Sequence, residues 1–72
     1  MELLIFRTDI KSKKKVKFLK PVFKKYTDIL RWSVDLEDID NVLRIEANTN
    51  ITEDDIIKIV QLHGFYIKTL PD

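Results

Sequence analysis

The sequence predicts an α+β domain, a βαββαβ sandwich whose four-stranded antiparallel sheet carries two helices on one face. Two segments place apolar residues at helical spacing, and four shorter segments alternate or run apolar as strands do. These segments follow one another in the order β-α-β-β-α-β. A chain of 72 residues closes only one hydrophobic core, so we expect a single domain over residues 1–72.

The first strand is expected over residues 2–10, where four consecutive apolar residues precede an alternating pattern. Such a run is typical of a central strand that is buried on both faces. Ser12 can serve as the N-cap of the first helix. Pro21 lies inside that helix, and a kink is expected there because the apolar residues continue in phase beyond it. The apolar side of the helix is formed by Val16, Phe18, Leu19, Val22, Phe23 and Tyr26.

The middle of the chain predicts a β-hairpin. Apolar and polar residues alternate over residues 30–37, which indicates a strand with one buried face. Turn-forming residues at 38–41 connect it to a second alternating segment at 43–47. The buried side chains of the first of these strands are expected to be Leu30, Trp32, Val34 and Leu36.

The second helix has consistent start and stop signals. Thr52 can cap it while Asp55 answers from the third helical position, and acidic residues in this first turn suit the positive end of the helix dipole. Gly64 is placed to end the helix in the left-handed conformation, and residues 65–70 predict the last strand. With right-handed crossovers, this order of elements gives a ferredoxin-like sandwich.

The composition excludes several kinds of site. The chain has no cysteine, so it has no disulfide, no thiolate metal site and no cysteine nucleophile. No apolar run approaches the length of a membrane span or a secretory signal, and we therefore expect a cytoplasmic protein without a membrane partner. No glycine-rich phosphate loop and no activated nucleophile is evident, so neither an enzyme nor a bound cofactor is expected.

The charge is unevenly distributed although the net charge is only +1. Residues 1–31 hold ten Lys/Arg and three Asp/Glu, whereas residues 32–72 hold three Lys/Arg and nine Asp/Glu. Halves of opposite charge give the molecule a strong dipole, which can steer a charged partner or a second copy of the chain.

From Ser12 onward the sequence resembles the heavy-metal-associated domains, which are the ferredoxin-like modules of copper chaperones and of copper-pump N-terminal repeats. The resemblance lies in the apolar spacing of the first helix, a Val-x-Leu strand, and a second helix that ends in Gly-Phe. It implies the same fold over nearly the whole chain. The residues that carry it are Val16, Leu19, Phe23, Ile29, Val34-Asp35-Leu36-Glu37, Thr52-Glu53-Asp54-Asp55-Ile56-Ile57 and Gly64-Phe65.

Those domains bind Cu(I) through two thiolates of a Met-x-Cys-x-x-Cys loop between the first strand and the first helix. In this sequence Ile10, Ser12 and Lys15 stand at the positions of the methionine and the two cysteines. A hydroxyl or an ammonium group cannot replace a thiolate as a Cu(I) ligand. The resemblance therefore implies the fold without its metal site.

The candidate binding site is the basic segment at this same loop and along the first helix. Lysines at a helix N-terminus oppose the helix dipole, so this segment breaks a local rule. A run of like charges is more often simply solvated, and that explanation ranks first. The functional explanation is that an anion or an acidic protein surface binds there, with the helix N–H groups and Ser12 as donors and the lysines as countercharge. The candidate residues are Lys11, Ser12, Lys13, Lys14 and Lys15, together with Lys17, Lys20 and Lys24, which form a stripe with Lys13 along the helix.

Other conspicuous residues have simpler explanations. Trp32 alternates in phase with apolar residues and is expected in the core, and His63 has no evident acidic partner. The acidic residues between 35 and 40 lack the spacing and the glycine of a calcium loop. The outward residues of the third strand are Arg44 and Glu46 rather than aromatics, which argues against nucleic acid as a partner.

The sequence therefore predicts a non-enzymatic binding or protein-interaction module that uses the basic loop and the first helix. The alternative is a metal-handling, copper chaperone-like protein that acts through oxygen or nitrogen ligands or through a partner's thiols. Nucleic-acid binding ranks third. We expect a monomer at physiological salt, because contacts between oppositely charged exposed surfaces are screened there.

Overall fold

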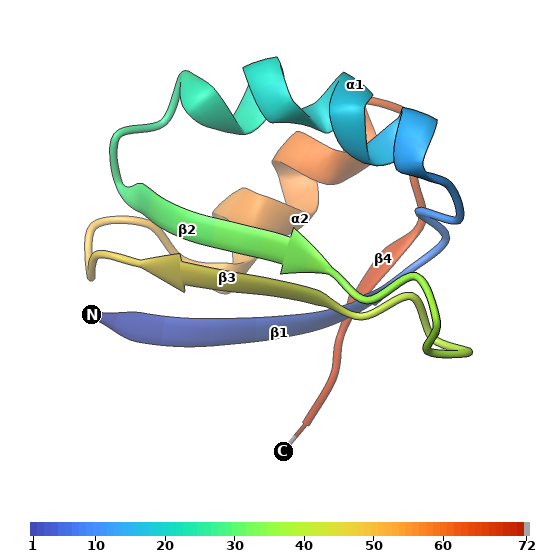
Figure 1. The fold of residues 1–72 in the computed structure, drawn as a ribbon. Helices are drawn as coiled ribbons and strands as arrows, with labels where there is room; N and C mark the ends of the chain where they lie inside the picture. The colour runs from blue at the N-terminus through green and yellow to red at the C-terminus, as the bar shows by residue number, and fades with distance from the viewer. Residues whose placement is uncertain (72) are drawn as a thin grey trace.

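The computed structural model describes residues 1–71 and contains one antiparallel sheet with two helices. The strands lie in the order β2-β3-β1-β4. Both helices cover the same face of this sheet (Figure 1), which confirms the predicted fold class. The elements are β1 (Glu2–Thr8), α1 (Lys13–Lys24), β2 (Ile29–Val34), β3 (Leu43–Ala47), α2 (Glu53–Leu62) and β4 (Ile67–Thr69).

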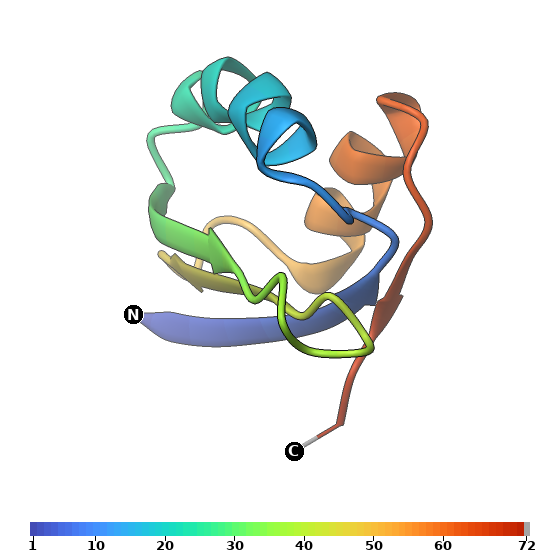
Figure 2. The ribbon, with the colours of Figure 1, turned by 45° about the vertical axis from the view of Figure 1, so that its right-hand side comes forward.

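The hydrophobic core lies between the sheet and the two helices. Alternate side chains of β1 and β3 point into it and meet the apolar faces of α1 and α2. α1 lies against the edge strand β2, and α2 lies against β4 (Figure 2). The largest fully buried side chains are Phe6, Phe23, Ile10, Leu19, Leu43, Ile45, Ile56 and Val60.

The predicted helix caps are confirmed. The Ser12 hydroxyl oxygen accepts the Lys15 N–H at 3.2 Å. Thr52 and Asp55 form a reciprocal capping box, in which each side chain accepts a hydrogen bond from the backbone N–H of the other. Gly64 has a φ of +89° and ends α2, as expected of a residue without a Cβ.

The last strand is shorter than the expected 65–70. The Phe65 N–H donates to the Val60 carbonyl at 3.3 Å, so Phe65 belongs to the helix stop rather than to the sheet. β4 begins only at Ile67 and pairs with the end of β1 through three residues.

The first strand differs from the expectation in length and in burial. It ends at Thr8, whose hydroxyl donates to the Asn41 carbonyl at 2.7 Å and accepts the Ile10 N–H at 3.1 Å. These two hydrogen bonds hold the backbone in the bend by which the chain leaves the sheet. Burial on both faces was wrong: Leu4 and Phe6 face the helices, whereas Leu3 on the opposite face is 57% exposed. The physical reason is that both helices cover one face and leave the other open.

The second strand also departs from its predicted pattern. A β-bulge shifts the β2–β3 register between Ile29 and Arg31, so that Ile29 pairs with Ala47 and Leu30 has no place in the alternation. Leu30 is consequently 52% exposed and was wrongly assigned to the core. The strand ends at Val34, and Leu36 lies in the following turn.

α1 is one helix across Pro21, and its apolar face is narrower than the sequence indicated. Leu19, Val22 and Phe23 are buried, whereas Phe18 is 53% exposed. Tyr26 lies beyond the end of the helix and is also exposed. Two helices share one face of a small sheet, so each has room to bury only a narrow stripe of side chains.

Candidate functional site

The most pronounced electrostatic feature is a run of unpaired lysines. Residues 11–25 contain eight lysines and no Asp or Glu, and every one of these lysines is exposed. The two ion pairs formed within residues 1–71 use arginines instead, Arg7 with Asp40 at 3.4 Å and Arg31 with Glu46 at 3.5 Å. We call this run the lysine surface; it comprises Lys11, Lys13, Lys14, Lys15, Lys17, Lys20, Lys24 and Lys25.

The lysine surface begins at a helix N-terminus that no acid compensates. The first turn of α1 contains no Asp or Glu, although acids are favoured at this end of a helix. The Ser12 oxygen accepts the Lys15 N–H as the N-cap, and its hydroxyl hydrogen stays available to donate to a ligand. Lys11, Lys13, Lys14 and Lys15 surround this turn, and their contribution is charge.

Further along α1, the structure brings three of the candidate lysines to the border of a groove. Two adjoining hollows of about 450 and 260 Å³ are lined by residues of both α1 and β2. Lys17 and Lys20 line the first, Lys20 and Lys24 line the second, and Trp32 lines both. We call this feature the α1–β2 groove. Its other lining residues are Val16, Ser33 and Val34 in the first hollow, and Phe23, Ile29 and Leu30 in the second.

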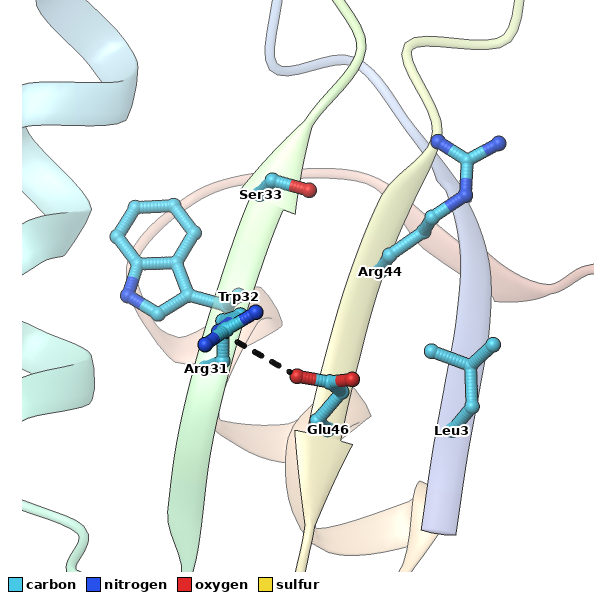
Figure 3. Close-up of a pocket in the computed structure, with 6 residues that line it drawn as sticks. All are labelled: Leu3, Arg31, Trp32, Ser33, Arg44 and Glu46. Atoms are coloured by element: carbon cyan, nitrogen blue, oxygen red, sulfur yellow. Dashed lines mark ion pairs between the residues drawn. The ribbon is translucent and has the colours of Figure 1, made fainter.

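Trp32 is the residue of the groove whose role the sequence analysis missed. It was assigned to the core, but it is only half-buried. Its ring contacts Phe23 of α1 edge-on, with centroids 4.8 Å apart. Figure 3 shows the indole on the outer side of β2, away from β3. The half-exposure of Trp32 follows from the position of β2 at the sheet edge, because an edge strand has no neighbouring strand to cover its outer side.

The face of the sheet opposite the helices has a different character. Arg31, Ser33, Arg44 and Glu46 stand on it beside Leu3 and border a shallow hollow (Figure 3). Arg44 and Glu46 point outward, as the sequence predicted. Trp32 is the only aromatic residue in the lining of this hollow. This face therefore offers guanidinium groups but no row of rings on which bases could stack.

Acidic residues of the 35–40 turn and His63 make hydrogen bonds to the backbone within the fold. Asp35 accepts the Glu37 N–H, and Asp38 accepts the Asp40 N–H. The His63 ring contacts the Ile59 carbonyl at 2.7 Å through Nδ1 and packs edge-on against Phe18. Within residues 1–71, no group of three His, Cys, Asp or Glu side chains is arranged to hold a metal ion.

Among the titratable groups of residues 1–71, only Asp55 has a clearly shifted pKa, and it lies outside the lysine surface. Hydrogen bonds from the backbone and the side chain of Thr52 lower the pKa of Asp55, and the charge of Lys58 acts in the same direction. The lowered pKa reflects the capping box of α2 and so belongs to the fold.

Comparisons with known proteins extend the fold assignment. The chain is similar to a solved structure of a CsoZ metallochaperone, with a TM-score of 0.77 over 93% of this chain and 96% of that chain. The sequence identity is 16%, so the similarity establishes a shared fold. No protein-family model matches the sequence, and no curated protein matches it either. None of the helices in residues 1–71 is both long and apolar enough to cross a membrane.

Proposed function

We propose that this protein is a non-enzymatic interaction module that binds an acidic partner through the lysine surface. The observation that carries the proposal is the complete lack of acids among residues 11–25, whose eight lysines all remain exposed and outside the ion pairs of the structure. Of the five Lys and Arg side chains outside this run, Arg7 and Arg31 form ion pairs, whereas Arg44, Lys58 and Lys68 form none with residues 1–71.

The lysine surface is costly for the isolated domain, and an acidic partner removes that cost. Like charges at helical spacing repel one another, and lysines at a helix start oppose the dipole. Carboxylates placed against these lysines replace repulsion by attraction and accelerate the encounter. A complex of this kind forms rapidly and weakens as salt increases.

The test uses a fluorescently labelled polyglutamate peptide and two charge-matched variants. Lys17→Glu/Lys20→Glu reverses two lysines of the surface, and Lys58→Glu/Lys68→Glu reverses two exposed lysines on α2 and β4. We expect the first variant to weaken binding at least about tenfold and the second to change it by less than about threefold, because contact charges matter more than net charge.

Equal weakening by both variants would show that net charge alone attracts the peptide, and the proposal would fail. A single-stranded oligonucleotide serves as the competing ligand. If it binds more tightly than polyglutamate with a steeper dependence on salt, the lysines serve a nucleic acid instead.

The second candidate function is metal handling, which the similarity to the metallochaperone favours. The chain has no cysteine, so a role of this kind requires thiols supplied by a partner. We expect the purified protein to release Cu(I) completely to a strong Cu(I) chelator. Stoichiometric copper retained on the protein would make metal handling the leading function.

A further inference from the structure

We propose that the acidic partner binds as an extended peptide that adds to β2 as a fifth strand of the sheet, within the α1–β2 groove. This inference rests on the proposed function, because it assigns the lysine surface one class of ligand and one geometry. It depends on three features of the groove: a free strand edge, an apolar floor and a border of lysines.

The free edge is defined by the hydrogen-bond phase of β2. The Asp35 N–H donates to the Val42 carbonyl at 2.9 Å, so alternate residues of the strand turn their backbone groups toward β3. Ser33 and Arg31, two and four residues before Asp35, turn their backbone N–H and C=O groups toward β3 as Asp35 does. The residues between them, Trp32 and Val34, turn these groups away from β3. No strand lies on that side, because β2 is first in the sheet order.

The edge is accessible from Trp32 to Val34. The bulge between Ile29 and Arg31 twists the start of the strand and ends regular pairing there. Beyond it, the hollow beside α1 leaves space next to the strand. The other edge of the sheet is β4, which also has three residues, but the two hollows lined by lysines lie beside β2.

The groove selects the side chains of the added strand. Trp32 and Val34 turn their side chains toward the helices, so peptide residues opposite them also face α1. An apolar side chain there covers Trp32 and Val16, and acidic side chains two residues away meet Lys17 and Lys20. Every second residue of the expected ligand faces α1, and these residues are acidic and apolar in turn.

A second copy of this chain fits the groove less well. Pairing of two β2 edges around a twofold axis would bring Lys17, Lys20 and Lys24 of both copies together. Such repulsion is absent when the incoming strand carries acids. The observations therefore favour an acidic peptide segment of another protein.

The test peptide is Glu-Thr-Val-Thr-Glu-Thr-Val-Thr-Glu, acetylated and amidated at its ends. The peptide is expected to add antiparallel to β2. In an extended chain its Glu and Val residues share one side, and in this orientation their N–H groups face β2 when that side faces α1. N-methylation of the Glu and Val residues should weaken binding at least about tenfold, since it removes the ladder donors. N-methylation of the Thr residues is the matched control and should preserve binding within about threefold.

Amide hydrogen exchange locates the added strand. Peptide binding should slow exchange at Trp32 and Val34, whose N–H groups face solvent in the free protein. Exchange at Arg31 and Ser33 should change little, because these groups already pair with β3. Val34→Pro removes one outer donor, is tolerated at a strand edge, and should weaken the peptide as well. If Val34→Pro unfolds the domain, the comparison of the two N-methylated peptides still tests strand addition.

The outcomes separate this inference from the proposed function. If both N-methylated peptides bind like the parent peptide, and Lys17→Glu/Lys20→Glu still weakens all three, strand addition is wrong while the acidic-partner proposal stands. If polyglutamate binds but the alternating peptide does not, strand addition is also wrong. If neither ligand binds the wild-type protein, both proposals fail.

Discussion

Single side chains at the start of β2 decide which surface the groove presents. Ile29 packs against the core, and the bulge displaces Leu30 into solvent. Trp32 lines the groove and contacts Phe23 edge-on. Alternation in the sequence cannot reveal this arrangement. Both Leu30 and Trp32 fit a regular strand, and only the extra residue of the bulge moves Leu30 outward.

The bulge predicts opposite sensitivities at two neighbouring apolar residues. Ile29→Ala should lower the free energy of unfolding by about 2 kcal/mol, because it removes apolar contacts from the core. Leu30→Ala should change it by less than about 0.5 kcal/mol, because the side chain is 52% exposed. Urea denaturation of both variants checks this. A larger loss for Leu30→Ala than for Ile29→Ala would contradict the register.

The capping carboxylate predicts a pH dependence of stability. The pKa of Asp55 is lowered in the folded state from its ordinary value of 3.8, so the ionised form stabilises the fold. This stabilisation is present above the unfolded-state pKa and is lost as the pH falls through the folded-state pKa. Asp55→Asn should therefore be less stable than wild type at neutral pH, and the difference should vanish at the acid end of a urea series. A difference that persists in strong acid would rule out the charge as its cause.

At the scale of the elements, α1 combines favourable packing with unfavourable local chemistry. Its helical period and its Ser12 cap could be predicted from the sequence, and so could the exposure of its lysines. The groove could not, because its shape depends on how α1 sits against β2 and on the side chain of Trp32. Pro21 adds a second local conflict, since it lies inside the helix without an N–H.

Replacement of Pro21 measures how much stability the helix loses through the missing backbone N–H. Pro21 is exposed while the following Val22 and Phe23 are buried. Pro21→Ala restores a backbone donor for the carbonyl one turn earlier and should stabilise the domain, by up to about 3 kcal/mol. A higher urea midpoint for the variant is the expected result. A lower midpoint would mean that the proline sets the position in which Val22 and Phe23 pack.

In the whole molecule, the basic and acidic segments of the sequence lie in different helices. The lysine surface occupies α1 above the β2 edge, whereas α2 starts with three acids. The βαββαβ topology followed from the pattern of segments, and the structure adds the strand order β2-β3-β1-β4, which places β2 at an edge. The predicted fold, with both helices on one face, already implies an open face. The apolar run in β1 obscured which of its side chains lie on that open face, because such a run resembles a strand that is covered on both sides.

This asymmetry predicts weak association that depends on salt. We expect a monomer near physiological salt, where the Debye length is about 8 Å, and reversible self-association only at low ionic strength. Lys17→Glu/Lys20→Glu/Lys24→Glu should abolish that association without unfolding the domain, since all three side chains are exposed. Sedimentation at two salt concentrations provides the measurement. A dimer that persists in high salt would indicate an apolar interface instead.

The central claim is that the lysine surface binds acidic ligands, and NMR mapping of a polyglutamate titration tests it most directly. The account predicts that amide shift changes concentrate in residues 11–25 and along β2, and that they disappear in Lys13→Glu/Lys14→Glu/Lys15→Glu combined with Lys17→Glu/Lys20→Glu. Shift changes centred instead on Arg7 of β1 and Arg44 of β3, which lie on the open sheet face, would contradict it, as would the absence of any shift at low salt.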